Sequence, residues 1–219
     1  MGGDPQGVLR VVNDADAAAA VSIHAIDDAG VRTGPATLTL DASAAVQLSA
    51  TGLGRLAGDV RLVLDSDLPV VPSAYVRAAD GTLGAMHDTV RAASSGTSGP
   101  YRYEVPVFNP STEVTQVSRL RLINPGDAAA AVANGARDDG GAEATGGEVT
   151  LTLAAGCAKT LTARQLETGD ADITGRLGAG TGKWRLTVSS DRPLQVVNIV
   201  ATFPQNRHEG KYSSNIISH

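Results

Sequence analysis

The sequence is poor in the residues and segments that mark several classes of protein. Cys157 is the single cysteine among 219 residues, which excludes an internal disulfide and a cysteine-based metal site. Aromatic residues make up 3% of the chain, so its cores must be filled with aliphatic side chains. No apolar run approaches the roughly 20 residues that span a bilayer, and we expect no membrane insertion. Met1–Pro5 has neither a basic nor an apolar stretch, so we expect no signal peptide in this chain.

Basic residues are also too few for a nucleic-acid binder. The formal net charge is −5, whereas proteins that bind nucleic acid need a basic surface to displace counterions. The hydrophobic content of 42% suffices to build cores. The length fits one large domain or two domains of the usual size, about 100 to 150 residues each.

The chain contains one stretch twice. Leu9–Val21 reads like Leu120–Val132, and each copy closes with a pair of aspartates, Asp27–Asp28 and Asp138–Asp139. Further matching blocks follow in the same order, and the offset in residue number between the copies changes only in loops. These blocks are Leu38–Leu40 with Leu151–Leu153, Leu48–Ala50 with Leu161–Ala163, and Ser66–Pro69 with Ser190–Pro193. This order predicts an internal duplication with a shortened loop in the first copy.

The apolar residues within each copy have a period of two. Val149–Leu153 and Trp184–Val188 both alternate apolar with polar or threonine positions, which predicts strands with one buried face. Turn residues separate these runs, as in Asn124–Gly126, Asp27–Gly30, Asp138–Gly141 and Asp80–Gly81. We therefore expect an all-β fold of two tandem antiparallel β-sandwich (immunoglobulin-like) domains related by internal duplication.

Two segments compete with this reading. The alanine runs Ala17–Ala20 and Ala128–Ala131 have high helix propensity, but a turn precedes each, so we expect each to lead into a strand. Leu161–Glu167 is typical of a short helix, with Thr162 as its N-cap and Gly169 just past its end.

The predicted domains are residues 1–95 and 96–219. The Ser- and Gly-rich stretch 92–100 is a natural linker. The second domain then begins with a strand, Tyr101–Phe108, that has no counterpart in the first, and Pro106 places it at a sheet edge or strand end. Either the first domain is cut at its N-terminus, or the strand belongs to the first domain and completes it. Whether the tail 203–219 forms a last strand is left open.

No catalytic motif is present. A nucleophile elbow, a Walker loop, an HExxH motif and an EF-hand loop are all missing, and we expect no enzyme. The histidines are His24, His87, His208 and His219. We expect His24 to lie in a strand, at the core margin or facing solvent. His87 neighbours Asp88, but a triad is recognised by geometry and not by sequence.

Paired aspartates are the candidate metal ligands. Asp14, Asp16, Asp27, Asp28, Asp138 and Asp139 all fall in predicted turns. Calcium takes six to eight oxygen ligands, which loops of a β-sandwich can pool. The structural alternative is that aspartate caps backbone amides in turns, and none of these runs has a full ligand spacing.

Two single residues have a structural and a functional interpretation. Trp184 alternates with Leu186 and Val188, so we expect it in a core rather than on a ligand-stacking surface. Cys157 lies in a predicted turn with no basic cluster around it in the sequence, so we expect it to be unreactive.

Several segments together resemble a tandem β-sandwich-like repeat module of large secreted or surface proteins of Gram-negative bacteria: Tyr103–Pro110, Gln116–Gly126, Leu153–Gly156, Leu161–Ala163 and Gly182–Asp191. The resemblance implies an extracellular or cell-surface location and no catalytic residues. We expect a structural or adhesion module that contacts other copies of the repeat, the same chain or a surface protein, with self-association through sheet edges. The alternative is a module that binds calcium or a glycan through its Asp-rich turns.

Overall fold

The computed structural model describes residues 6–49, 52–53, 60–77, 83–87, 100–202 and 211–217. The contacts divide the chain into unit 1, Met1–Thr89, and unit 2, Val90–His219. The boundary predicted at residue 95, the linker and the turn Asp80–Gly81 lie outside the described residues.

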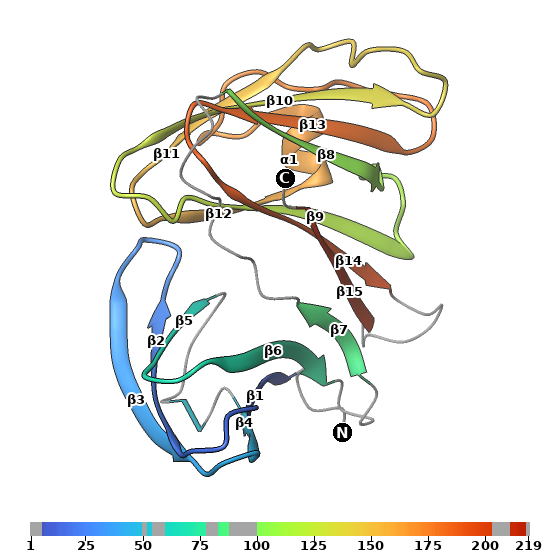
Figure 1. The fold of residues 1–219 in the computed structure, drawn as a ribbon. Coiled ribbons are helices and arrows are strands. Elements are labelled where there is room, and N and C mark those ends of the chain that lie inside the picture. The colour runs from blue at the N-terminus through green and yellow to red at the C-terminus, as the bar shows by residue number, and fades with distance from the viewer. Residues whose placement is uncertain are drawn as a thin grey trace. The chain divides into compact units, whose positions relative to one another are not determined.

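Unit 1 consists of two antiparallel sheets (Figure 1). The four-stranded sheet has the order β4-β1-β6-β7, with β1 Gln6–Asn13, β4 Ala45–Ser49, β6 Val70–Arg77 and β7 Leu83–His87. The three-stranded sheet has the order β3-β2-β5, with β2 Ala19–Ile26, β3 Arg32–Leu40 and β5 Arg61–Ser66. Leu9 and Val11 from the first sheet and Val21 and Ile23 from the second share one core.

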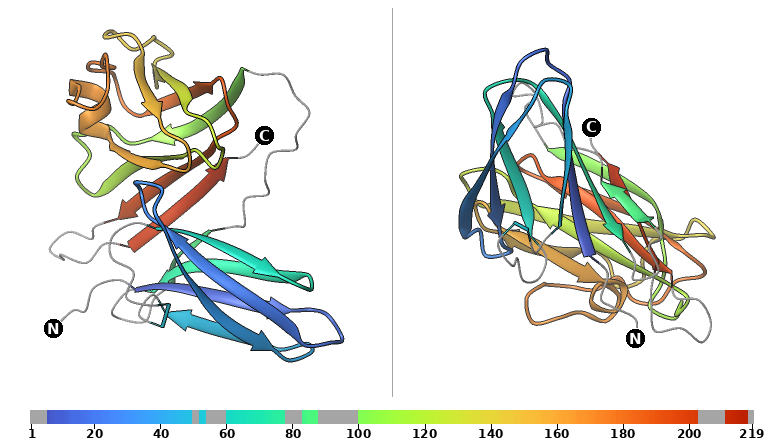
Figure 2. Two further views of the ribbon diagram at one scale, coloured as in Figure 1. Left: turned by 90° about the vertical axis from the view of Figure 1, so that its left-hand side faces the viewer. Right: turned by 90° about the horizontal axis from the view of Figure 1, so that it is seen from below.

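Unit 2 consists of two four-stranded antiparallel sheets, which Figure 2 shows from two further sides. One has the order β12-β9-β14-β15, with β9 Gln116–Ile123, β12 Ala158–Thr162, β14 Gln195–Thr202 and β15 Lys211–Ile217. The other has the order β11-β10-β13-β8, with β8 Tyr101–Phe108, β10 Ala130–Asp138, β11 Val149–Leu153 and β13 Trp184–Ser190. Both sheets contribute to one core that holds Phe108, Leu120, Leu161 and Trp184.

The two units place their strands in the same order except at one edge. In unit 1, β4-β1-β6-β7 follows the order of β12-β9-β14-β15 in unit 2, and β3-β2-β5 follows that of β11-β10-β13. Strand β8 has no counterpart in the sheets of unit 1 as described. The all-β prediction is confirmed.

The alanine runs enter strands as predicted, since β2 begins at Ala19 and β10 at Ala130. At each strand the buried positions alternate with less buried ones, so an alternating pattern outweighs helix propensity here. The predicted short helix is confirmed as α1, Ala163–Thr168. Thr162 caps it in a capping box with Gln165, and Gly169 ends it.

The tail forms a strand, because β15 pairs with β14. Among the described residues, no helix has the length and apolar character needed to cross a membrane.

Candidate functional site

A buried asparagine lies at the same place in each unit, directly after the first matched strand. The amide nitrogen Nδ2 of Asn13 donates to the carbonyl oxygens of Ala17 (2.8 Å), Leu40 (3.1 Å) and Asp41 (3.0 Å). Its Oδ1 accepts from the amide of Ala15 at 3.1 Å. The side chain therefore ties the turn after β1 to the end of β3.

Asn124 repeats this arrangement in unit 2. Its Nδ2 donates to the carbonyl oxygens of Ala128 (2.8 Å), Leu153 (3.1 Å) and Ala154 (3.1 Å), and its Oδ1 accepts from Gly126 N at 3.0 Å. Both asparagines are completely buried. Their polar atoms are engaged by the backbone, so both act as structural clamps.

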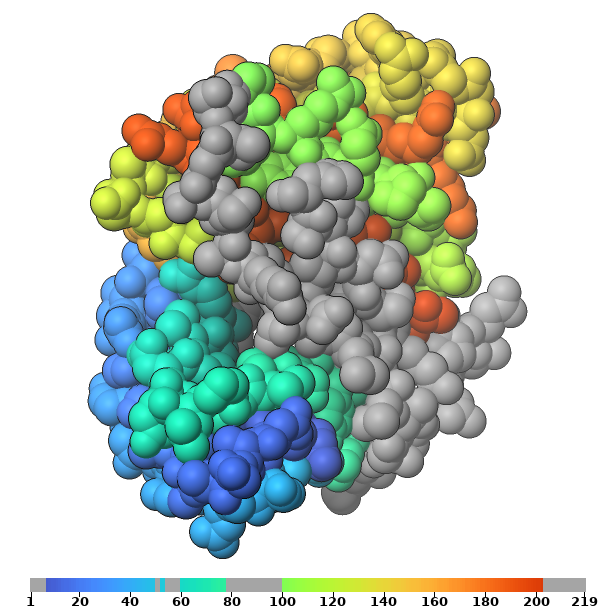
Figure 3. Space-filling model, viewed as in Figure 1, coloured from blue at the N-terminus to red at the C-terminus, as the bar shows by residue number. Residues whose placement is uncertain are grey.

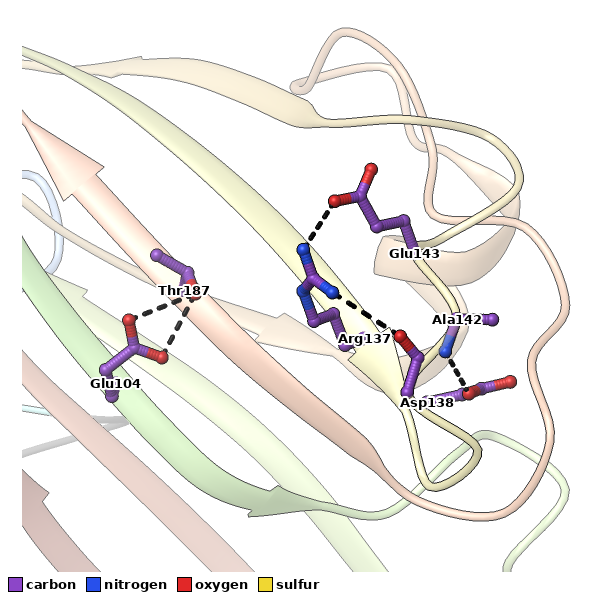
Figure 4. Close-up of polar contacts among 7 residues, drawn as sticks. Glu104, Arg137, Asp138, Ala142, Glu143 and Thr187 are labelled. Atoms are coloured by element: carbon purple, nitrogen blue, oxygen red, sulfur yellow. Dashed lines mark hydrogen bonds and ion pairs between the residues drawn. The ribbon is translucent and has the colours of Figure 1, made fainter.

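The paired aspartates also recur with the same contacts. Oδ1 of Asp27 accepts from the amide of Val31 at 2.8 Å, and Oδ1 of Asp138 accepts from Ala142 N at 3.0 Å (Figure 4). A second amide, that of Thr181, donates to Oδ2 of Asp138 at 3.0 Å. The amides of Thr181 and Ala142 hold the pKa of the Asp138 carboxyl below its usual value, against the effect of burial.

The other candidate metal ligands do not gather around these turns. Asp14 and Asp16 are exposed, and Oδ2 of Asp139 accepts from the amide of Lys183 at 2.8 Å. In the part of the chain that the structure describes, no group of three or more His, Cys, Asp or Glu side chains is placed to hold a metal ion. Calcium binding by these residues stays the alternative to a structural role.

His24 and Cys157 lie in the strand and in the turn that the sequence predicted for them. His24 is in β2, half-buried, with its Nε2 3.9 Å from Oδ2 of Asp65. The same carboxylate pairs with Arg32 at 3.2 Å, so the contact belongs to a surface ion-pair group. Cys157 lies in a turn and packs partly against the core of unit 2. The side chains of His87, His208 and His219 lie outside the described residues.

Trp184 is 1% exposed, so the prediction of a core tryptophan is confirmed. Its Nε1 donates to Oε1 of Glu167 at 2.9 Å, and the same carboxylate accepts from the amide of Ser111 at 3.1 Å. The side chain therefore offers no surface for stacking a ligand.

An open groove of about 610 Å³ lies on the outer face of the sheet that contains β10 and β11. Small uncharged side chains line most of it, such as Ala133, Thr150 and Thr152. Its two carboxylates are already engaged: Asp172 pairs with Lys159 at 2.7 Å, and Asp191 accepts from the amide of Ala131 at 2.8 Å. The groove therefore offers hydroxyl groups but no acid–base pair.

The edge strand β8 completes the sheet β11-β10-β13-β8 of unit 2. It pairs with β13 antiparallel, with Tyr103 opposite Val188, Glu104 opposite Thr187 and Val105 opposite Leu186. Tyr103 and Val105 are buried, and the Tyr103 hydroxyl accepts from a buried backbone amide at 2.7 Å, that of Leu194. On the outer face Thr187 donates to Glu104 at 3.0 Å (Figure 4).

The prediction that Pro106 marks a sheet edge is confirmed. The register of β8 against β13 shifts between Trp184 and Leu186, where β8 carries one residue more than its partner. Pro106 lies in this irregular stretch, where a missing amide donor is tolerated. The strand belongs to unit 2, which answers the question that the sequence left open.

The strand of unit 1 that matches β13 is β5. Asp67 and Asp191 fix this match, because Oδ1 of each accepts from an amide of the neighbouring strand, Ala20 N and Ala131 N, at 2.8 Å. In the described part of unit 1, β5 pairs with β2 alone. Residues 60–77 are seen at the surface of unit 1 in turquoise in Figure 3. Sequence reasoning found the extra strand Tyr101–Phe108 but not its partner strand β13.

The likeness to known proteins is structural and distant. No protein-family model matches the chain, and no curated protein matches it. A solved structure titled "Crystal Structure of Thermotoga maritima 1070" is similar with a TM-score of 0.41 and 11% sequence identity. The match covers 56% of this chain and 96% of that chain.

Proposed function

We propose that this chain is a non-catalytic structural or adhesion module of an extracellular or cell-surface bacterial protein. In this proposal its two units are immunoglobulin-like β-sandwiches related by internal duplication, and a sheet edge provides the contact to other protein chains. One observation carries the proposal: the polar side chains that recur between the units are engaged by the backbone.

Three matched pairs support this reading. Asn13 and Asn124 clamp three carbonyl groups each, Asp27 and Asp138 each cap a turn, and Asp67 and Asp191 each tie two strands. A duplicated binding module is expected to repeat ligand-facing groups in its copies. Here the repeated groups serve the scaffold, which favours a structural role.

The location is tested by protease treatment of intact cells of the source organism. An antibody against the chain would detect it before and after treatment, with a cytoplasmic protein as the internal control. We expect the signal to be lost from intact cells while the cytoplasmic control survives. Protection that ends only on lysis would overturn the extracellular proposal.

The contact role is tested on the purified chain by size-exclusion chromatography with light scattering, alone and mixed with extracts of the cell surface. We expect a concentration-dependent rise in mass or a complex with a surface protein. A strictly monomeric chain that captures nothing at high concentration would count against any adhesion role.

A further inference from the structure

We infer that the core of unit 2 binds one internal water molecule at Asn134, in the middle of β10. The water donates a hydrogen bond to Oδ1 of Asn134 and accepts one from its Nδ2. This site lies inside a single unit, so it is separate from the proposed contact role and does not depend on it.

The amide of Asn134 is buried without the hydrogen bonds that it can make. The residue is 0% exposed, and its Oδ1 has no donor among the residues that the structure describes. Its Nδ2 lies 3.5 Å from the carbonyl oxygen of Val149, beyond the usual range of about 2.7–3.2 Å. Buried polar groups without a partner are rare, because they lose the hydrogen bonds to water that they make in the unfolded chain. Asn134 therefore needs a donor that the protein does not supply.

Two other asparagines show that burial alone does not leave an amide in this state. Asn13 and Asn124 are also 0% exposed. Oδ1 of Asn124 accepts from the amide of Gly126 at 3.0 Å, and its Nδ2 has three carbonyl oxygens within 3.1 Å. Asn13 has the same set of partners in unit 1. The lack of a donor is thus a property of the site around Asn134.

Strand β2 of unit 1 has an apolar residue at the matching position. Asn134 lies opposite Val188 in β13, and Ile23 lies opposite Leu64 in β5, which is the matched pair of strands. The neighbouring inward positions are identical in the two strands: Ala130, Val132 and Ala136 in β10, and Ala19, Val21 and Ala25 in β2. Ile23 is 3% exposed, so the isoleucine fits into the same frame. The one difference in this row is a shorter, polar side chain in unit 2.

The exchange of isoleucine for asparagine leaves room for a water molecule. An isoleucine side chain is larger than that of asparagine by more than the roughly 30 Å³ that one water occupies in the liquid. The facing sheet does not compensate with a larger pair, because Leu120 opposite Leu161 matches Leu9 opposite Leu48. A buried water typically makes about three hydrogen bonds, and the long contact from Nδ2 to the Val149 carbonyl is one that a water can bridge.

A metal ion does not suit this position. Asn134 presents a neutral amide, and a charge in a core is costly unless a partner neutralises it. Among the described residues no group of three or more His, Cys, Asp or Glu side chains is placed to hold a cation. The chemistry of the site therefore calls for a small neutral molecule that both donates and accepts.

The first test is nuclear Overhauser transfer from water to the side-chain amides of the ¹⁵N-labelled whole chain. We expect a signal with the sign of a long-lived bound water at the amide protons of Asn134. Asn13 and Asn124 are the matched controls within the same sample, because they are equally buried and their polar atoms are engaged by the backbone. They should show no such signal.

The second test places the residue of unit 1 into unit 2. Oxygen-17 relaxation dispersion counts the long-lived internal waters of the whole chain, and we expect this count to fall by one in Asn134→Ile. Leu161→Val is the control, since Leu161 is a 0% exposed core residue of β12 and its truncation leaves an apolar space that stays dry. The count should be unchanged there. Trp184 fluorescence shows whether each variant is folded.

Three results would overturn the inference. One is a missing water signal at Asn134 in the parent chain, which needs no variant and holds even if Asn134→Ile does not fold. Another is an equal signal at Asn13 and Asn124, which would mean that solvent enters by opening of the fold and not by binding at one site. The last is a folded Asn134→Ile variant that keeps the full count of internal waters.

Discussion

The buried amide of Asn124 shows why a single side chain type is required at a turn inside a sandwich. Its planar group presents two N–H donors to three carbonyl oxygens and one acceptor to an amide, all within 3.1 Å. No apolar side chain can satisfy these carbonyls, and an aspartate would place negative charge against them. The same holds for Asn13 in unit 1.

Replacing this asparagine should destabilise unit 2 strongly. We expect Asn124→Ala to lower the free energy of unfolding by about 2–4 kcal/mol, because buried carbonyl groups lose their donors. Urea denaturation followed by Trp184 fluorescence measures this, since the only tryptophan is in unit 2 and 1% exposed. Asp127→Ala, at an exposed position of the same turn, is the control and should cost less than about 0.5 kcal/mol. Equal costs for the two variants would contradict the clamp.

The carboxylate of Asp138 should make unit 2 sensitive to acid. Its pKa in the folded state is lowered, first by the hydrogen bond from Thr181 N. The stabilisation is therefore present above the unfolded-state pKa, about 3.9, and is lost as the pH falls through the lower folded-state value. We expect the urea midpoint of the tryptophan transition to fall on acidification below about pH 4.

The variant Asp138→Asn tests the assignment. It should be less stable at neutral pH and should show a shallower pH dependence than the parent chain. Some dependence will remain, because the pKa values of Asp170 and Glu113 are lowered in the same direction. An unchanged slope would mean that Asp138 does not contribute.

At the scale of elements, α1 has six residues and depends on its cap. Thr162 Oγ1 accepts from the amide of Gln165 at 3.2 Å, and Gln165 Oε1 accepts from the amide of Thr162 at 2.9 Å. Leu166 is then held in the core at 0% exposure. A helix this short does not form on propensity alone.

We expect Thr162→Ala to lower the free energy of unfolding by about 1 kcal/mol through loss of the cap. Thr162→Ser keeps a hydroxyl and should recover most of this difference. Urea denaturation read by Trp184 fluorescence gives both values. A serine variant as unstable as the alanine variant would show that the threonine acts by packing and not by capping.

Most elements could be predicted because their signals are local. Alternation predicted Val149–Leu153 as a strand, and the cap residues predicted α1. The pairing of β8 with β13 could not be predicted, because it joins segments far apart in the sequence and alternation does not name a partner.

At the scale of the whole molecule, the two units differ in how well their cores are covered. Leu38, Leu48, Leu62 and Leu64 are only partly buried in unit 1, whereas Leu120, Leu161 and Leu186 are fully buried in unit 2. Local opening is easier where few apolar contacts are buried. We expect the amides of β2 to exchange with solvent faster than those of β10 in native-state hydrogen exchange. Equal protection of the two strands would contradict this.

The melting temperature of the whole chain with and without calcium tests the alternative of a calcium site. We expect no rise of the melting temperature at millimolar calcium, because carboxylate oxygens of Asp27 and Asp138 are occupied by backbone amides. A ligand that binds only the native state must raise this temperature. A clear rise that disappears in the double variant Asp14→Asn, Asp16→Asn would establish a calcium site in the first turn instead.

The pairing of β8 with β13 also affects when unit 2 can fold during its synthesis. About 75 residues separate the end of β8 from the start of β13. At about 5–20 residues per second, a ribosome needs several seconds to synthesise them. Throughout that interval β8 has no partner strand, and sheets built from such distant strands fold slowly, in milliseconds to seconds. The sheet β11-β10-β13-β8 therefore cannot be completed before β13 leaves the ribosome.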